Sequence, residues 1–173
     1  MLHALIMAGG GGTRFWPRSR QKRPKQFLTL SGDRSLLQQA FDRIEGQVSP
    51  ERTWVITGAS YADETRRQLS GLPADRIIGE PCGRDTAACI GLGAALIAKQ
   101  DPQAVMIVTP ADHVIEPVDT FQSCIKKGWN LELRDLSWLI AFPSPASLFR
   151  SLHKSTRKKN ERRTGQIYFS LQV

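Results

Sequence analysis

The feature that most constrains the fold is an alternation of short apolar runs with segments of helical periodicity. The apolar runs have the length and composition of buried strands, and they lie at residues 3–8, 54–57, 76–79 and 104–109. Segments that suit helices lie between them, at residues 36–48, 62–69 and 86–98. Strands that alternate with helices predict a parallel sheet with right-handed crossovers. The predicted fold class is therefore α/β, with a mostly parallel sheet flanked by helices.

The first expected helix is amphipathic. Its apolar residues recur at steps of three and four, at Leu36, Leu37, Ala40, Phe41, Ile44 and Val48. This spacing places them on one face of a helix. Asp33 or Ser35 can cap its N-terminus, because both side chains accept hydrogen bonds from first-turn N–H groups.

Two loops of the predicted sheet carry residues suited to ligand binding. Four glycines at residues 9–12 follow the first strand, and an acidic turn follows Thr109 at the end of the last. In open parallel sheets, ligands bind beyond the carboxyl ends of the strands. We therefore expect these two loops to share one cleft.

The glycine loop reads Ala-Gly-Gly-Gly-Gly-Thr-Arg-Phe-Trp-Pro from Ala8 to Pro17. It fits neither the dinucleotide fingerprint, which needs a sixth-position glycine, nor the Walker A loop, which needs lysine after glycine. Glycines nevertheless let backbone N–H groups approach a polyanion closely. Arg14 and Lys25 add cations suited to phosphate oxygens. The alternative is a flexible glycine loop with surface cations, and the combined pattern favours a phosphate site.

Four ordered segments together resemble the sugar-1-phosphate nucleotidyltransferases. The segments are Ala8 to Pro17 followed by Ser19-Arg20, then Pro24-Lys25-Gln26-Phe27, then Glu80-Pro81-Cys82-Gly83-Arg84-Asp85-Thr86-Ala87, and finally Val108-Thr109-Pro110-Ala111-Asp112-His113. The Trp16-Pro17, Ser19-Arg20 and Lys-Gln-Phe elements are similar to the mannose-1-phosphate guanylyltransferase branch. The resemblance covers residues 1–121 and implies a Rossmann-like nucleotide-diphospho-sugar transferase fold.

The resemblance also implies a reaction and roles for residues. Mannose 1-phosphate attacks the α-phosphorus of GTP, which gives GDP-mannose and pyrophosphate without a covalent enzyme intermediate. Arg14 and Lys25 are the implied catalytic residues, holding the leaving pyrophosphate and neutralising charge. The implied nucleotide-binding residues are Ala8, Gly9, Gly10, Gly11, Gly12, Thr13, Glu80, Arg84, Asp85, Thr86 and Ala87. Asp112 is the implied ligand of Mg²⁺, which is the expected cofactor. His113 is expected at most to support Asp112 without binding the ion itself.

Simpler explanations exist for several of these residues. Asp112 could be only a turn or a helix cap. Arg84 and Asp85 could form a local salt bridge at the start of a helix, where Asp85 also suits the dipole. Trp16 is expected to pack beneath the glycine loop, and Cys82 and Cys89 are expected to be small buried residues.

The net charge of +8 is unevenly distributed along the chain. Residues 1–121 carry 14 Lys and Arg against 13 Asp and Glu, whereas residues 122–173 carry 10 against 3. We therefore expect two parts, an N-terminal part of a nucleotidyltransferase domain at 1–121 and a basic, poorly ordered tail at 122–173. Because the expected pattern of strands stops there, the hypothesis is that the fold is incomplete and the tail arises from a frameshift or truncation that impairs activity.

Composition bears on the location and the partners of the chain. The sequence has no apolar stretch long enough to span a membrane, no secretion signal, and three cysteines without metal-type spacing. These features favour a reduced cytoplasmic protein without a membrane partner. The expected partners, GTP and mannose 1-phosphate, are implied by the resemblance; no nucleic-acid partner is expected, and the sequence leaves the oligomeric state open. Two alternatives remain, a nucleotide-binding module without catalysis and a nucleic-acid-binding protein that uses the basic tail.

Overall fold

A computed structural model describes residues 1–10, 16–20, 24–30 and 32–135. Its parallel sheet has four strands, which are β1 (Leu2–Ala8), β2 (Thr53–Gly58), β3 (Ile77–Glu80) and β4 (Val105–Pro110). The order across the sheet is β3-β2-β1-β4. The described residues also form four α-helices, which are α1 (Leu36–Ile44), α2 (Ala62–Gln68), α3 (Asp85–Gln100) and α4 (Val118–Asp135). The predicted α/β class is confirmed.

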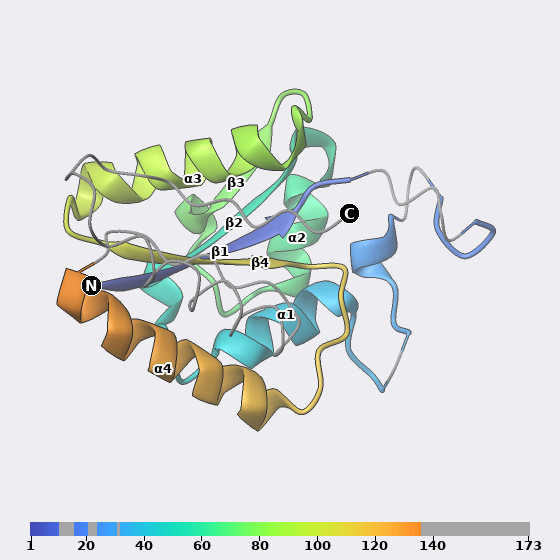
Figure 1. Ribbon diagram of the computed structural model, residues 1–173. Helices are drawn as coiled ribbons and strands as arrows, with labels where there is room; N and C mark the ends of the chain where they lie inside the picture. Colours follow the sequence, from blue (N-terminus) through green and yellow to red (C-terminus); the bar gives the residue numbers. More distant parts are fainter. Residues whose placement is uncertain (11–15, 21–23, 31, 136–173) are drawn as a thin grey trace.

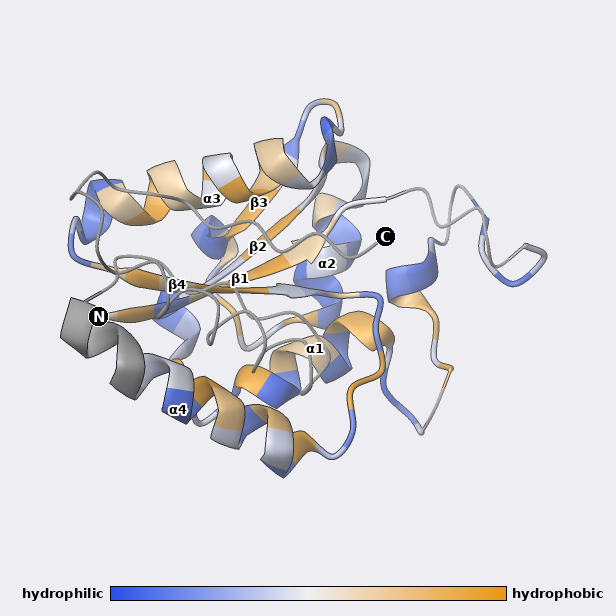
Figure 2. Ribbon diagram, viewed as in Figure 1, coloured by the Kyte–Doolittle hydropathy of each residue, from blue (hydrophilic) through white to orange (hydrophobic). Residues whose placement is uncertain are grey.

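The helices cover both faces of the sheet. Of the described helices, α3 lies on one face, and α1 and α4 lie on the other (Figure 1). Apolar residues are concentrated on the strands (Figure 2). On the α3 face, Leu5, Met106 and Val108 pack with Ile90 and Ile97, and all five side chains are buried. On the opposite face, residues of β1, β2 and β3 pack with α1 and with the segment that follows α2, and Ile107 of β4 packs with α4, as the two-residue alternation of a strand requires.

Helix α1 begins with a capping box that settles which residue is its N-cap. Ser35 Oγ accepts a hydrogen bond from the backbone N of Gln38 at 3.2 Å, and Gln38 Oε1 accepts from the backbone N of Ser35 at 3.0 Å. Two otherwise unpaired N–H groups are thereby satisfied at once. Of the two predicted candidates, Ser35 is therefore the cap and Asp33 is not.

We predict that Ser35→Ala lowers the free energy of unfolding by about 1 kcal/mol, because one first-turn N–H loses its partner. The Ser35 hydroxyl also donates to Gln68 Oε1 at 2.6 Å, so the variant loses a tie between α1 and α2 as well. Urea denaturation followed by circular dichroism would measure the change. Ser70→Ala removes an exposed hydroxyl and is the control. Equal stability of the two variants would contradict the capping role.

Helix α4 crosses the expected boundary at residue 121. Phe121, Cys124 and Ile125 are buried against Ile107 of β4, so the packed core continues past that position. The predicted tail at 122–173 falls largely outside the described residues, which end at 135, and the division of the chain stays a prediction. Within the described residues, no helix combines the length and the apolarity that crossing a bilayer requires.

Candidate functional site

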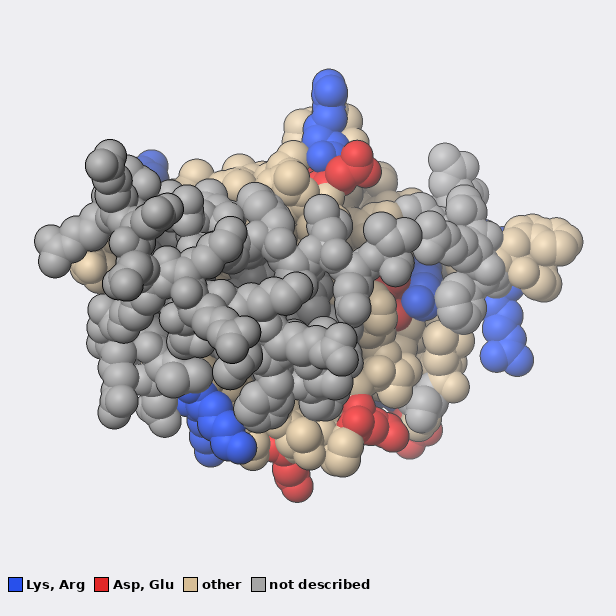
Figure 3. All heavy atoms as spheres, in the orientation of Figure 1, with Lys and Arg blue, Asp and Glu red and all other residues tan. Residues whose placement is uncertain are grey.

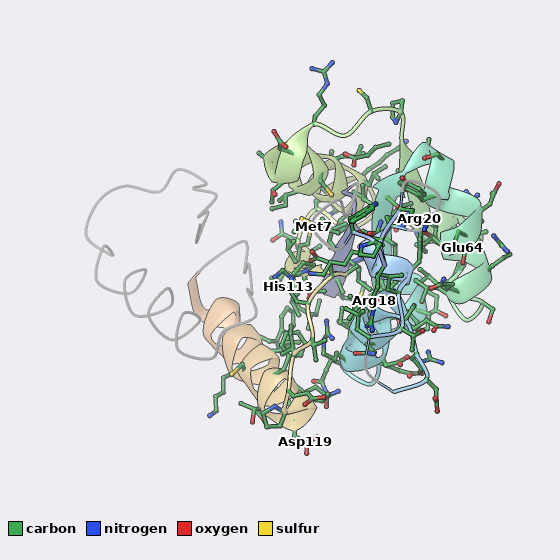
Figure 4. The ribbon with its side chains drawn as sticks, turned by 90° about the vertical axis from the view of Figure 1, so that its right-hand side faces the viewer. Met7, Arg18, Arg20, Glu64, His113 and Asp119 are labelled. Atoms are coloured by element: carbon green, nitrogen blue, oxygen red, sulfur yellow. The ribbon has the colours of Figure 1, made fainter. Side chains whose placement is uncertain are left out.

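The carboxyl ends of the four strands bring most of the predicted site residues to one edge of the sheet. Met7 pairs with Pro110, and Ala8 pairs with Thr57. Gly58 in turn pairs with Glu80, so all four strands end close to the same line. Figure 4 looks at this end of the molecule, with Met7 and His113 labelled. The glycine loop, called the glycine turn below, follows β1 at Gly9, and the acidic turn follows β4 at Ala111. The two turns therefore begin at neighbouring strands, as the expected shared cleft requires.

The glycine turn is described only at its beginning. Gly9 and Gly10 follow Ala8, and Gly10 has φ of 127°, a conformation that L side chains rarely adopt. The predicted residues Gly11, Gly12, Thr13 and Arg14 lie outside the described residues, so their roles remain predictions. Trp16 lies just beyond and is 77% exposed, so the expectation that it packs beneath the loop is wrong.

Lys25 and Asp112 meet beside this turn. Lys25 Nζ lies 3.4 Å from Asp112 Oδ2, although 87 residues separate them in the sequence. His113 Nδ1 lies 2.9 Å from the other carboxylate oxygen of Asp112. The side chains of Lys25 and Asp112 are 19% and 43% exposed, so both groups remain accessible to a ligand. A cation and a carboxylate thus lie next to each other at the edge formed by the carboxyl ends of the strands.

The surroundings of Asp112 fit one kind of metal ion. Among the described residues, no group of three or more His, Cys, Asp and Glu side chains is placed to hold a metal. In the part of the chain that the structure describes, Asp112 could therefore offer one carboxylate, and an ion bound there would take its other ligands from elsewhere. Mg²⁺ suits this arrangement, because it commonly takes one or two carboxylates and completes its shell with substrate phosphates and water.

Glu80 lies on the other side of the glycine turn, at the end of β3. Only 9% of Glu80 is exposed, and burial raises the pKa of its carboxyl. Its Oε2 lies 3.8 Å from the position that a Cβ on Gly9 would occupy, so the carboxyl abuts the start of the turn. Burial, together with the nearby Glu80, also raises the pKa of the Cys89 thiol to about 12. Cys89 thus stays protonated at neutral pH and is no nucleophile.

We predict that Glu80→Gln raises the thermal unfolding midpoint at pH 7, because it removes a charge that burial disfavours. For a carboxyl whose pKa is raised in the folded state, stability is highest below the unfolded pKa and falls as pH rises through the folded value. The advantage of the variant should therefore shrink as the pH is lowered towards 4. Scanning calorimetry of both proteins at the two pH values tests this, and an advantage that grows with acidity would contradict it.

The loop before α3 is exposed along its length. Residues Pro81 to Ala87 all face solvent, so Arg84, Asp85, Thr86 and Ala87 are accessible, as a ligand-facing role requires. Asp85 has φ of 64°, which is uncommon outside glycine. Within the described chain Arg84 contacts Cys82, its Nε lying 3.5 Å from the sulfur, and makes no ion pair with Asp85. The expected burial of Cys82 is wrong, whereas that of Cys89 is confirmed.

Two buried side chains at this edge are not among the predicted site residues. Gln26 Nε2 and Thr57 Oγ1 both donate to the carbonyl oxygen of Ala8, at 2.8 Å and 3.1 Å. The sequence points to Gln26 only as part of a motif and to Thr57 only as the end of a strand. For Thr57, the position at the carboxyl end of a strand beside β1 is the one sequence signal that points to this edge of the sheet.

Charge on the described surface is mixed. Acidic and basic side chains are interspersed on the face shown in Figure 3. This agrees with the near balance of charges in residues 1–121. The described residues of this face do not form a surface dominated by positive charge, which is the kind of surface that binds nucleic acid.

Comparisons of the sequence with known proteins point to a single family. Residues 3–141 match the nucleotidyl transferase family. The chain is 43% identical over 130 residues to mannose-1-phosphate guanylyltransferase 2 of Escherichia coli O157:H7, which covers 72% of this chain and 27% of that protein. It is 41% identical over 132 residues to the mannose-1-phosphate guanylyltransferase of Escherichia coli K12, with 73% and 27% covered.

A solved structure also matches the described fold. The crystal structure of mannose-1-phosphate geranyltransferase from Thermus thermophilus aligns with a TM-score of 0.68 and 33% identity, over 77% of this chain and 38% of that one. The chain spans about a quarter of the length of the curated relatives given above, at 27% of each.

Proposed function

This chain belongs to the nucleotidyl transferase family, and from that premise we propose that it transfers a guanylyl group from GTP to mannose 1-phosphate, forming GDP-mannose and pyrophosphate. The observation that carries the proposal is the approach of Lys25 to Asp112 beside the glycine turn, at 3.4 Å. The pair supplies a cation for phosphate oxygens and a carboxylate for a metal at one edge of the sheet.

The chemistry requires positioning and charge neutralisation. A phosphate oxygen of mannose 1-phosphate forms a new bond to the α-phosphorus of GTP, and the bond from that phosphorus to pyrophosphate breaks. The attacking oxygen is already anionic, so no general base is required. Catalysis then consists of holding the two phosphates in line and offsetting the charge that they bring together.

Several residues of this chain would share that work. Backbone N–H groups from Gly9 onward would approach the triphosphate, with Arg14 on the leaving pyrophosphate. The Lys25 ammonium would neutralise charge next to the reacting phosphates. Asp112 would hold Mg²⁺, which when bound supplies further positive charge to the phosphate oxygens. The role of His113 would be to orient the Asp112 carboxylate, since its Nδ1 lies 2.9 Å from Oδ1.

The nucleoside part of GTP would lie towards β3 and the start of α3. Glu80 and the exposed residues Arg84, Asp85, Thr86 and Ala87 line that side of the edge. Support for guanine as the base and mannose as the sugar comes from the names of the relatives rather than from a geometric feature of these residues.

Pyrophosphate release tests the proposal directly. The purified chain would be assayed with GTP, ATP, UTP or dTTP, each combined with mannose 1-phosphate or glucose 1-phosphate, in the presence of Mg²⁺. The expected result is the highest rate with GTP and mannose 1-phosphate, and no release without Mg²⁺. A higher rate with another pair would overturn the assignment of substrates while leaving nucleotidyl transfer in place.

A nucleotide-binding module without catalysis is the second candidate. One observation favours it, namely that the described residues place no group of three or more His, Cys, Asp and Glu side chains where it could hold a metal ion. It predicts Mg²⁺-dependent binding of GTP without release of pyrophosphate when mannose 1-phosphate is added. Calorimetric titration beside the release assay separates the two candidates.

A further inference from the structure

The carbonyl oxygen of Ala8 is fixed by two side chains from distant parts of the sequence. Gln26 Nε2 donates to it at 2.8 Å, and Thr57 Oγ1 donates at 3.1 Å. All three residues are inside the protein, with exposures of 1% for Ala8, 2% for Gln26 and 0% for Thr57. A carbonyl oxygen has two lone pairs, so it can accept both bonds.

Both donors are themselves held in place. Thr57 lies in β2 directly opposite Ala8 in the parallel register, and a β-branched side chain has few χ1 alternatives. Gln26 lies in a short 3-10 turn at Lys25–Phe27, whose Phe27 is buried and packs edge-on against Tyr61 at 6.0 Å between ring centroids. The two hydrogen bonds therefore join β1 to two rigid neighbours.

Two parts of the candidate phosphate site depend on this junction. The glycine turn starts at Gly9, one residue after Ala8, and glycines have no side chains that could anchor them. Two side chains thus hold the peptide of Ala8 at the point where β1 ends and the turn begins. Lys25, whose ammonium lies 3.4 Å from Asp112, is the neighbour of Gln26 on the other side of the junction.

We propose that Thr57 and Gln26 are positioning residues, which set the glycine turn and the Lys25 ammonium relative to each other by holding the Ala8 carbonyl. Neither side chain needs to touch the nucleotide, because each acts through the backbone of Ala8. The inference rests on the proposed function to the extent that the turn and Lys25 bind a nucleoside triphosphate. It requires binding of GTP but not catalysis.

Thr57→Val is the sharpest test, because valine keeps the shape of threonine and removes only the donor. We expect Thr57→Val to weaken GTP binding in Mg²⁺ buffer about fivefold, the scale of one buried hydrogen bond, and to lower kcat for pyrophosphate release more than it raises KM for mannose 1-phosphate. Thr57→Ser keeps the hydroxyl and should bind GTP within about twofold of the wild type. Gln26→Met removes the other donor and should shift GTP binding in the same direction as Thr57→Val.

The same strand provides a matched control. Thr53, at the opposite end of β2, is 1% exposed, and its Oγ1 donates to the carbonyl of Ser49 at 3.1 Å. Thr53→Val thus removes the same kind of bond, but far from the glycine turn. It should lower the unfolding midpoint about as much as Thr57→Val and leave the affinity for GTP unchanged.

Calorimetric titration with GTP distinguishes every outcome. Wild-type affinity in Thr57→Val, or equal weakening in Thr57→Val and Thr53→Val, would overturn the positioning role. If Thr57→Val does not fold, Gln26→Met decides by the same criterion. A wild-type chain that binds GTP without releasing pyrophosphate would defeat the proposed transfer reaction but leave the affinities of the variants readable, and one that binds no GTP would defeat both proposals.

Discussion

Asp112→Ala is expected to lower the rate of pyrophosphate release by about 10²- to 10³-fold, the loss typical when one group that stabilises transition-state charge is removed. The carboxylate is the one metal ligand that we assign to this chain, and no cluster of alternatives exists among the described residues. Its removal also leaves Lys25 without the acidic partner that lies 3.4 Å away. The rate should therefore fall through loss of the metal and through a changed position of the ammonium.

The fold should survive this substitution. The Asp112 side chain is 43% exposed, and its turn is held by the bond from the backbone N of Ala111 to the carbonyl of Met7 at 2.9 Å. Asp33→Ala, which removes an exposed carboxylate from the loop before α1, is the control and should keep the wild-type rate. Circular dichroism would confirm that both variants fold. Wild-type turnover by folded Asp112→Ala would remove Asp112 from the reaction.

Gly93→Val is expected to lower the free energy of unfolding by about 3 kcal/mol, at the upper end of the usual cost of overpacking a core. A Cβ at Gly93 would lie 2.5 Å from Leu5 Cδ2 and 2.9 Å from Leu5 Cδ1. Leu5 is fully buried in the centre of β1, so its side chain has little room to move aside. Helix α3 would have to lift from the sheet, which exposes the apolar residues between them.

Gly91 provides the control on the same helix. No atom lies within 4 Å of a Cβ at Gly91, and the residue is exposed. Gly91→Val should therefore be neutral or raise stability by a few tenths of a kcal/mol, because valine has the better helix propensity. Urea denaturation of the two variants measures the difference. A smaller loss at Gly93 than at Gly91 would show that contact with Leu5 does not limit this position.

Much of the fold could be predicted from the sequence, because its elements depend on local patterns. The apolar run at residues 104–109 corresponds to β4 at Val105–Pro110, and the periodicity after Ser35 corresponds to α1. Sheet topology then placed the turns after Ala8 and Thr109 side by side. The choice between Asp33 and Ser35 could not be made, because it depends on the reciprocal bonds with Gln38.

The site could be predicted less completely, because its details depend on contacts between distant residues. The sequence points to both Lys25 and Asp112, but their separation of 3.4 Å is a contact between residues 87 apart in the chain. The bond from Thr57 to Ala8 joins residues 49 apart, and nothing in the local sequence of either reveals it. The residue types of Trp16 and Cys82 predict burial, whereas both residues are exposed to solvent in the structure.

The place of β1 within the sheet has a consequence for how the molecule opens. Within the described chain, β1 has a hydrogen-bonded neighbour on each side, whereas β3 and β4 each have one. Releasing β1 therefore requires two ladders to break, and releasing β3 only one. Amide hydrogens of β3 should exchange with solvent before those of β1, as expected when local opening begins where fewest contacts hold. The base of the glycine turn would then persist through fluctuations that detach the outer strands.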